Sequence, residues 1–251
     1  MAENTLLKLL PIASLLLWTT PSASGQQSPS PEGEGQYVGR FVLYAGYMHL
    51  NSPKISLDEP GVHIQAGMRW SRHISLGFDY SRGTGSTTIG LSQATTALQN
   101  EFGPLVAQYQ QIVPTFKPEL PFASVTQTFT AGPEFPYRRW KRITPYIRPS
   151  VGIINEVATG HPENFITKRI IYVIAPSGKE EMWTAFYGFG GGVAINVTKH
   201  FSLIVQADFV HDHLFPDLLQ DGRNTIRFSI GPGFQFGHNV TKRWGIPGHW
   251  N

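Results

Sequence analysis

The chain of 251 residues contains no cysteine, carries few charges and has no long apolar run. The absence of cysteine excludes disulfides, thiolate metal sites, a thiol nucleophile and lipid attachment to an N-terminal cysteine. A helix that crosses a bilayer needs about 20 apolar residues, and no such stretch is present. The formal net charge of +3 is too small and too dispersed to indicate a nucleic-acid partner.

Residues 1–25 have the pattern of a secretory signal peptide. An apolar run from Leu9 to Trp18 is followed by Ala23, Ser24 and Gly25, which are small residues at the spacing of a cleavage site. Residues 26–36 are rich in Pro, Gly and Ser and are expected to form a flexible periplasmic lead-in. The folded part is therefore expected to begin at Tyr37.

From Tyr37 onward, bulky apolar residues alternate with small or polar residues. Successive side chains of a strand point to opposite faces, so this alternation predicts a sheet with one apolar face. The clearest stretch is ISLGFDYSR at 74–82. The predicted strands are 37–50, 61–71, 74–82, 122–135, 143–157, 183–197, 201–213 and 224–237.

The apolar face is too bulky to lie inside the barrel that these strands would form. A small barrel holds little beyond its own side chains or one small ligand, which argues against a water-soluble, lipocalin-like barrel. The other face is rich in Gly, Ser and Thr, which suits a narrow interior. The sequence therefore predicts an all-β fold, a closed antiparallel eight-stranded transmembrane β-barrel over 37–237, with its apolar face in lipid.

The lengths of the predicted connections alternate. The short links 71–73, 136–142 and 198–200 are expected at the periplasmic side, with the tail 238–251, because short turns of outer-membrane barrels lie there. The longer links 51–60, 83–121, 158–181 and 214–222 are then extracellular loops.

Two loop segments leave the strand count open. Residues 165–175 (FITKRIIYVIA) are β-prone and are interpreted as a hairpin above the membrane, with a further barrel strand as the alternative. Ten strands would need another strand within 83–121. That loop is instead predicted to be partly helical around a break at Gly103-Pro104, because its apolar residues recur at helical spacing.

The C-terminal strand carries the pattern polar-x-Gly-x-x-aromatic-x-aromatic, made by Ser229, Gly231, Phe234 and Phe236. This pattern resembles the signal read by the barrel assembly machinery. Together with AGPEF at 131–135 and the triple glycine at 190–192, it resembles the outer membrane protein A-like β-barrel family over about residues 37 to 237. The resemblance implies a bacterial outer-membrane location. It also implies outer-membrane lipids, the barrel assembly machinery and periplasmic chaperones as partners.

Six charged residues fall on the polar face of the predicted strands. They are expected to be paired or hydrated in the lumen, because an isolated buried ion is costly. A packed polar plug is the preferred interpretation, and a narrow pore of anionic preference is the alternative. The predicted lumen residues are Arg40, Arg69, Asp79, Arg148, Asp208 and Arg227.

The segment His211-Asp212-His213 is the most enzyme-like cluster of the chain. Its histidines share one face of a strand and would suit a metal or a lipid-hydrolysing pair. Polar anchoring at the membrane interface is the simpler interpretation, so no catalytic residue, metal or cofactor is expected.

The predicted function is structural, or an interaction through the loops, with weak solute passage left open. A lipid A-modifying enzyme and a surface adhesin are the alternatives. The sequence leaves the oligomeric state open.

Overall fold

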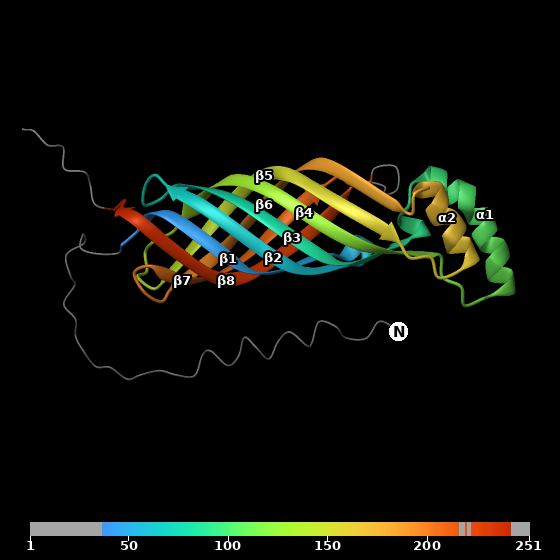
Figure 1. Cartoon of the computed structure of the whole chain (residues 1–251), viewed down its shortest axis with the longest axis horizontal. Coiled ribbons are helices and arrows are strands. Elements are labelled where there is room, and N and C mark those ends of the chain that lie inside the picture. The colour runs from blue at the N-terminus through green and yellow to red at the C-terminus, as the bar shows by residue number, and fades with distance from the viewer. Residues whose placement is uncertain (1–36, 216–218, 220–221, 242–251) are drawn as a thin grey trace, which may run out of the picture. The chain divides into compact units, whose positions relative to one another are not determined.

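The described part of the chain forms one closed antiparallel barrel. The computed structural model describes residues 37–215, 219 and 222–241. Eight strands pair in sequence order and β8 closes on β1, which confirms the predicted fold (Figure 1). The strands are β1 (Gly39–Ser52), β2 (Leu57–Arg69), β3 (Ser75–Gly90), β4 (Glu119–Pro136), β5 (Ile143–Gly160), β6 (Lys179–Asn196), β7 (Phe201–Asp212) and β8 (Arg223–Asn239).

One end of the barrel carries only short connections. They are residues 70–74, 137–142 and 197–200, and β1 begins at this same end, with Gly39 opposite Asn239 of β8. We call it the turn end, and the opposite end the loop end. The predicted signal peptide and lead-in lie outside the described residues. The barrel extends two residues further than predicted, to Asn239, and residues 242–251 of the predicted tail also lie outside the described part.

The exterior of the barrel is apolar between its two ends. Exposed large apolar side chains occur on every strand, and Phe78, Phe189 and Phe228 are 55%, 57% and 56% exposed. Exposing such a continuous apolar surface to water is unfavourable, whereas contact with lipid is favourable. A closed barrel also leaves no unpaired strand edge in the bilayer. The apolar-outside orientation predicted from the sequence is therefore the one that the fold adopts.

The strands extend further at the loop end than predicted. A strand needs about 9 to 11 residues to cross a bilayer, whereas β3 has 16 residues and β4 has 18. Along β3 the outward face changes from apolar, ending at Tyr80, to polar, beginning at Arg82, while Ile89 on the inward face is buried. We call the apolar part of the exterior the lipid-facing belt. Beyond this belt the barrel has a polar exterior and an apolar interior, as a water-soluble protein does.

The prediction of a long loop at 51–60 is wrong. The strands β1 and β2 continue pairing to Ser52 opposite Leu57. Only a short 3-10 helix, η3 (Pro53–Ile55), and Ser56 separate them, and Ser56 adopts a positive φ of 48°. Burial of Ile55 and Leu57 holds this tight connection against the inside of the barrel.

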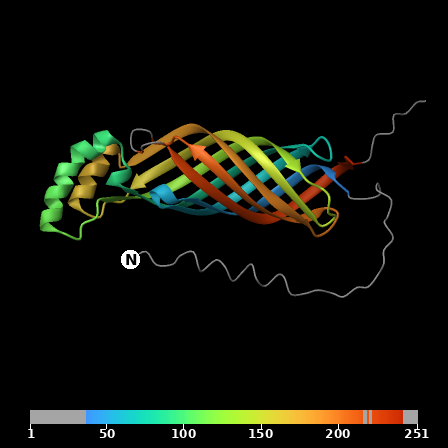
Figure 2. The same cartoon turned by 180° about the vertical axis from the view of Figure 1, so that it is seen from behind.

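Two helices lie side by side at the loop end (Figures 1 and 2). The first, α1 (Thr96–Ile112), follows the short 3-10 helix η4 (Leu91–Gln93) and confirms the predicted helix in the β3–β4 connection. The predicted break at Gly103-Pro104 is wrong, because α1 continues through Pro104. Phe102 and Val106 flank this proline on one face of the helix and are both buried, which holds the helix together across it.

The second helix, α2 (Phe165–Ile174), replaces the hairpin predicted at 165–175, so that prediction is wrong. Asn164 caps the helix: its Oδ1 accepts from the backbone N–H of Thr167 at 2.9 Å, and the Thr167 hydroxyl accepts from the Asn164 N–H at 3.1 Å. Ile166 and Ile170, one helical turn apart, are buried. The cap and this burial outweigh the β propensity of the isoleucines.

The connections at the loop end, residues 91–118 and 161–178, form what we call the cap. Its helices pack on apolar side chains that the upper strand ends direct inward, and together these make the hydrophobic core of the protein. The core includes Met48, Leu50, Ile55, Leu57, Ile89, Phe102, Val106, Leu120, Phe122, Ile154, Ile166, Ile170, Ile171 and Phe186.

Candidate functional site: the polar interior of the barrel

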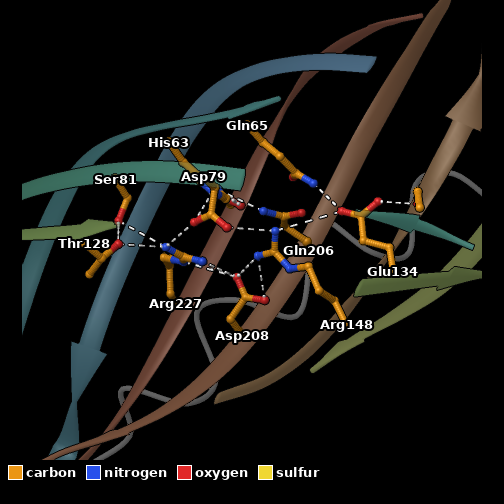
Figure 3. Close-up of polar contacts among 12 residues, drawn as sticks. His63, Gln65, Asp79, Ser81, Thr128, Glu134, Arg148, Gln206, Asp208 and Arg227 are labelled. Atoms are coloured by element: carbon orange, nitrogen blue, oxygen red, sulfur yellow. Dashed lines mark hydrogen bonds and ion pairs between the residues drawn. The ribbon is translucent and has the colours of Figure 1, made fainter. Parts of the chain in front are cut away.

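Four of the predicted lumen residues meet at the centre of the barrel, and we call them the charge ring. Arg148 Nη1 lies 2.9 Å from Asp79 Oδ2, and Arg148 Nη2 lies 3.2 Å from Asp208 Oδ1. Arg227 makes the complementary pairs, 3.1 Å to Asp79 Oδ1 and 2.8 Å to Asp208 Oδ2 (Figure 3). Each arginine thus bridges both aspartates, and the two positive and two negative charges cancel.

The ring is held from six of the strands. Arg227 Nη1 donates to the hydroxyls of Ser81 and Thr128, both at 3.1 Å. His63 Nε2 lies 3.2 Å from Asp79 Oδ1, and Gln206 Nε2 lies 2.9 Å from His63 Nδ1. These residues come from β2, β3, β4, β7 and β8, and Arg148 adds β5 (Figure 3). Buried charges are tolerated only when paired and hydrogen-bonded. All four charges of the ring are paired, and each of the four side chains makes at least one hydrogen bond, although Asp79 Oδ1 and Arg148 Nε make none to the described residues.

Arg69 and Arg40 lie apart from the ring. Arg69 is directed to the turn end, where its Nη1 donates to the Gly39 carbonyl at 3.2 Å and to Gln235 Oε1 at 2.5 Å. Arg40 lies where the pairing of β1 with β8 shifts register, and its guanidinium carbon is 6.0 Å from the centroid of the Phe41 ring. The extra residue of this shift lies in β8, where the three steps from Phe236 to Asn239 face the two from Phe41 to Gly39. Arg40 keeps the face of Val42 and Tyr44 and lies apart from the ring because it is at the turn end of β1.

Sequence reasoning missed several polar residues next to the ring. Glu134 accepts from Gln65 Nε2 and, at 3.1 Å, from the Ser75 hydroxyl, and lies 4.0 Å from Arg148 Nη1 (Figure 3). Tyr146 donates to Gln206 Oε1 at 2.5 Å. Their inward positions follow from the same alternation as those of the charged residues, so this pattern carried the signal.

A second buried ion-pair group, also missed, lies toward the loop end. Arg223 Nη1 is 2.5 Å from Glu156 Oε2, and Arg223 Nε is 3.0 Å from Asp212 Oδ2. All three side chains are buried. The alternation carried a signal for two of them, because Glu156 shares the face of Arg148 and Asp212 shares the face of Asp208, whereas Arg223 lies just outside the predicted strand 224–237.

Two arginines of neighbouring connections hydrogen-bond to each other at the turn end. Arg72 Nη2 donates to the Arg138 carbonyl at 2.6 Å, and Arg138 Nη1 donates to the Arg72 carbonyl. Burial lowers the pKa of Arg138 to about 9, and the positive charge of Arg69 acts in the same direction. Arg138 therefore still carries its charge at neutral pH.

The segment His211-Asp212-His213 is divided between the two faces of β7. Asp212 points inward to Arg223, whereas His211 faces outward and its Nδ1 lies 2.7 Å from Asn224 Oδ1. The rings of His211 and His213 are 4.9 Å apart, centroid to centroid. Because Asp212 is buried on the opposite face, it does not orient either imidazole. Among the residues that the structure describes, no group of His, Asp and Glu is arranged to hold a metal ion.

The predicted assembly signal lies in β8. Phe234 and Phe236 face outward and stack with a centroid distance of 5.8 Å. Ser229 faces inward, where its hydroxyl is 3.0 Å from His63 Nδ1. A Cβ atom at Gly231 would lie 2.2 Å from the carbonyl oxygen of Ala45, so the close approach of β1 requires glycine. The role of these residues in assembly stays a prediction.

No family model matches the chain, and no curated protein matches it in sequence. Among solved structures, Neisserial surface protein A is 12% identical, with a TM-score of 0.48 over 78% of this chain and 96% of that one. The outer membrane protein OprG of Pseudomonas aeruginosa is 10% identical, with a TM-score of 0.44 over 81% and 98%. The attachment invasion locus protein Ail of Yersinia pestis, in complex with a heparin analogue, is 12% identical, with a TM-score of 0.43 over 78% and 96%.

Within the described part of the chain, no helix is long and apolar enough to cross a membrane. The strands, in contrast, form a closed antiparallel ring with an even strand number, short connections at one end and an apolar exterior. These are the features of barrels that span bacterial outer membranes. By its own strand pairing and surface, the chain is an eight-stranded transmembrane β-barrel of the outer-membrane type.

Proposed function

We propose that the protein is an integral outer-membrane barrel with a closed lumen, and that it acts as a structural component or through the cap that it presents outside. The charge ring carries the first part of this proposal. Its four side chains occupy the barrel interior in a closed set of ion pairs.

A solute crossing the barrel would have to pass this ring. A hollow of about 40 Å³ lined by Gln65, Arg69 and Tyr146 lies toward the turn end, and a cavity of about 260 Å³ lies toward the loop end. The ring lies between them along the strands. Breaking a buried ion pair by removing a partner costs about 3 to 5 kcal/mol, so opening a path through the ring is strongly disfavoured.

The cap supports the second part of the proposal. The strands continue past the lipid-facing belt and enclose an apolar core there, and the two helices pack on it. A membrane anchor alone needs strands of about 9 to 11 residues and short loops. The additional folded structure outside the membrane is therefore what we assign to interaction.

Conductance of the purified, refolded protein in planar bilayers tests the closed lumen. We expect no steady conductance from the wild type. A variant with all four ring residues, Asp79, Arg148, Asp208 and Arg227, changed to Ser keeps zero net charge and removes the bulk of the plug, so it is expected to conduct. Arg82→Ser, on the outer face beyond the belt, is the matched control and should stay silent. Steady ohmic steps from every wild-type insertion would contradict the proposal.

A further inference from the structure

A cavity lies at the loop end, between the inward faces of the upper strands and the helices of the cap. Its volume is about 260 Å³. The helix α1 contributes Leu98, and the end of α2 contributes Val173 and Ile174. The strands β3 to β6 contribute the opposite wall, which includes Ile89, Phe122, Ala158 and Met182.

The cavity wall is apolar with an acidic side. Glu156 and Glu180 are the two charged lining residues, and none of the lining residues is basic. Glu156 is engaged by Arg223 at 2.5 Å. Glu180 lies opposite Ala158 in the β5–β6 pairing, and both line the cavity. An occupant would therefore meet a hydrocarbon surface and, at one side, a carboxylate.

The volume sets the size of the occupant. An apolar cavity of about 150 Å³ is known to hold benzene, so 260 Å³ leaves room for a single ring with a short chain. Apolar walls with a few placed polar groups are typical of small-molecule sites. A carboxylate beside an apolar wall favours a positive group on the ligand, because opposite charges attract.

We propose that this cavity binds a small apolar molecule that carries a cationic amine, with the amine placed at Glu180 and the apolar part among the side chains of the cap. The occupant is a solute and not a membrane lipid, because the cavity lies inside the barrel extension, beyond the lipid-facing belt. The proposal rests on the assignment of the cap as the functional part, but it does not depend on whether the lumen conducts.

Calorimetric titration of the refolded protein in lipid nanodiscs tests the proposal, with empty nanodiscs subtracted to remove partitioning into lipid. The probe is 2-phenylethylamine, which is a cation at pH 7. The comparison compound is 3-phenylpropanoate, which has a similar size and the opposite charge. We expect saturable binding of the amine and at least about tenfold weaker binding of the acid, equivalent to about 1.4 kcal/mol.

Two pairs of variants locate the site. Ala158→Leu fills the cavity and should abolish saturable amine binding, whereas Ala185→Leu, on the exposed outer face of β6, should leave it unchanged. Glu180→Gln should lower the affinity for the amine by about tenfold, which corresponds to the loss of one charge pair worth about 1.4 kcal/mol. Its neighbour variant Glu181→Gln, on the opposite face of β6, should not.

Each of the other outcomes overturns the proposal. They are the absence of saturable binding, equal binding of both probes, amine binding retained in Ala158→Leu, and no loss in Glu180→Gln. The β-sheet circular dichroism of every variant is recorded first, and the two cavity variants perturb different properties, so misfolding of one leaves the other as the test. Conductance of the same preparation is measured separately. A barrel that conducts and still binds the amine contradicts the closed lumen only.

Discussion

Replacing Arg148 with methionine removes one of the two cations of the charge ring while keeping most of the side-chain volume. Arg148 contacts Asp79 at 2.9 Å and Asp208 at 3.2 Å, and its side chain is 1% exposed. In the variant, both aspartates still face Arg227, at 3.1 Å and 2.8 Å. One guanidinium then has to balance two buried carboxylates, so the ring carries a net charge of −1.

Leaving an uncompensated buried charge costs about 3 to 5 kcal/mol. The cost should be smaller in Arg148→Met/Asp79→Asn, because Asp208 keeps its two contacts to Arg227 and the ring is neutral again. Residues that share one ion-pair network couple by about 0.5 to 3 kcal/mol. We therefore expect the double variant to be more stable than Arg148→Met alone, although it has lost a second native side chain.

Urea unfolding in lipid vesicles, followed by tryptophan fluorescence, measures these differences. The control is Arg82→Met, an exposed arginine on the outer face, for which a change within about 0.5 kcal/mol is expected. If Arg148→Met were as stable as this control, the ring charges would be hydrated and not buried, and the reasoning would be refuted. A double variant less stable than the single one would refute the charge-balance argument.

Three further changes test the faces, the assembly signal and the histidines. Phe78→Arg should lower the free energy of unfolding by about 2 to 4 kcal/mol in the same assay, because Phe78 faces lipid. Thr84→Arg, on the same face of β3 but beyond the belt, should leave the free energy of unfolding nearly unchanged. Equal losses in the two variants would contradict the belt assignment. Changing both Phe234 and Phe236 to Ala should lower the amount of protein in the outer-membrane fraction of cells, and a normal yield would remove the signal interpretation. Glutamine at both histidines of His211–His213 should leave the mass spectrum of lipid A unchanged; a protein-dependent mass shift that needs either histidine would instead favour the enzyme alternative.

The sequence by itself determined the architecture of the barrel. Regular alternation defined eight strands and the lipid-facing side, because successive side chains of a strand point to opposite faces of the sheet. The same alternation placed Asp79, Arg148, Asp208 and Arg227 on the inner face. Their mutual pairing followed only from the barrel closure, which brings the inward side chains of β3, β5, β7 and β8 into contact.

Tertiary contacts decided the loop end. The strand extensions beyond Arg82 were missed because the alternation reverses its phase there, so that apolar residues such as Ile89 turn inward. The segment 165–174 has β-prone residues and becomes a helix, because Ile166 and Ile170 find a buried surface beside the other cap helix and the upper strands. Local sequence fixes which face of a strand is apolar, but whether that face meets lipid, a polar plug or a second helix depends on what the rest of the chain places against it.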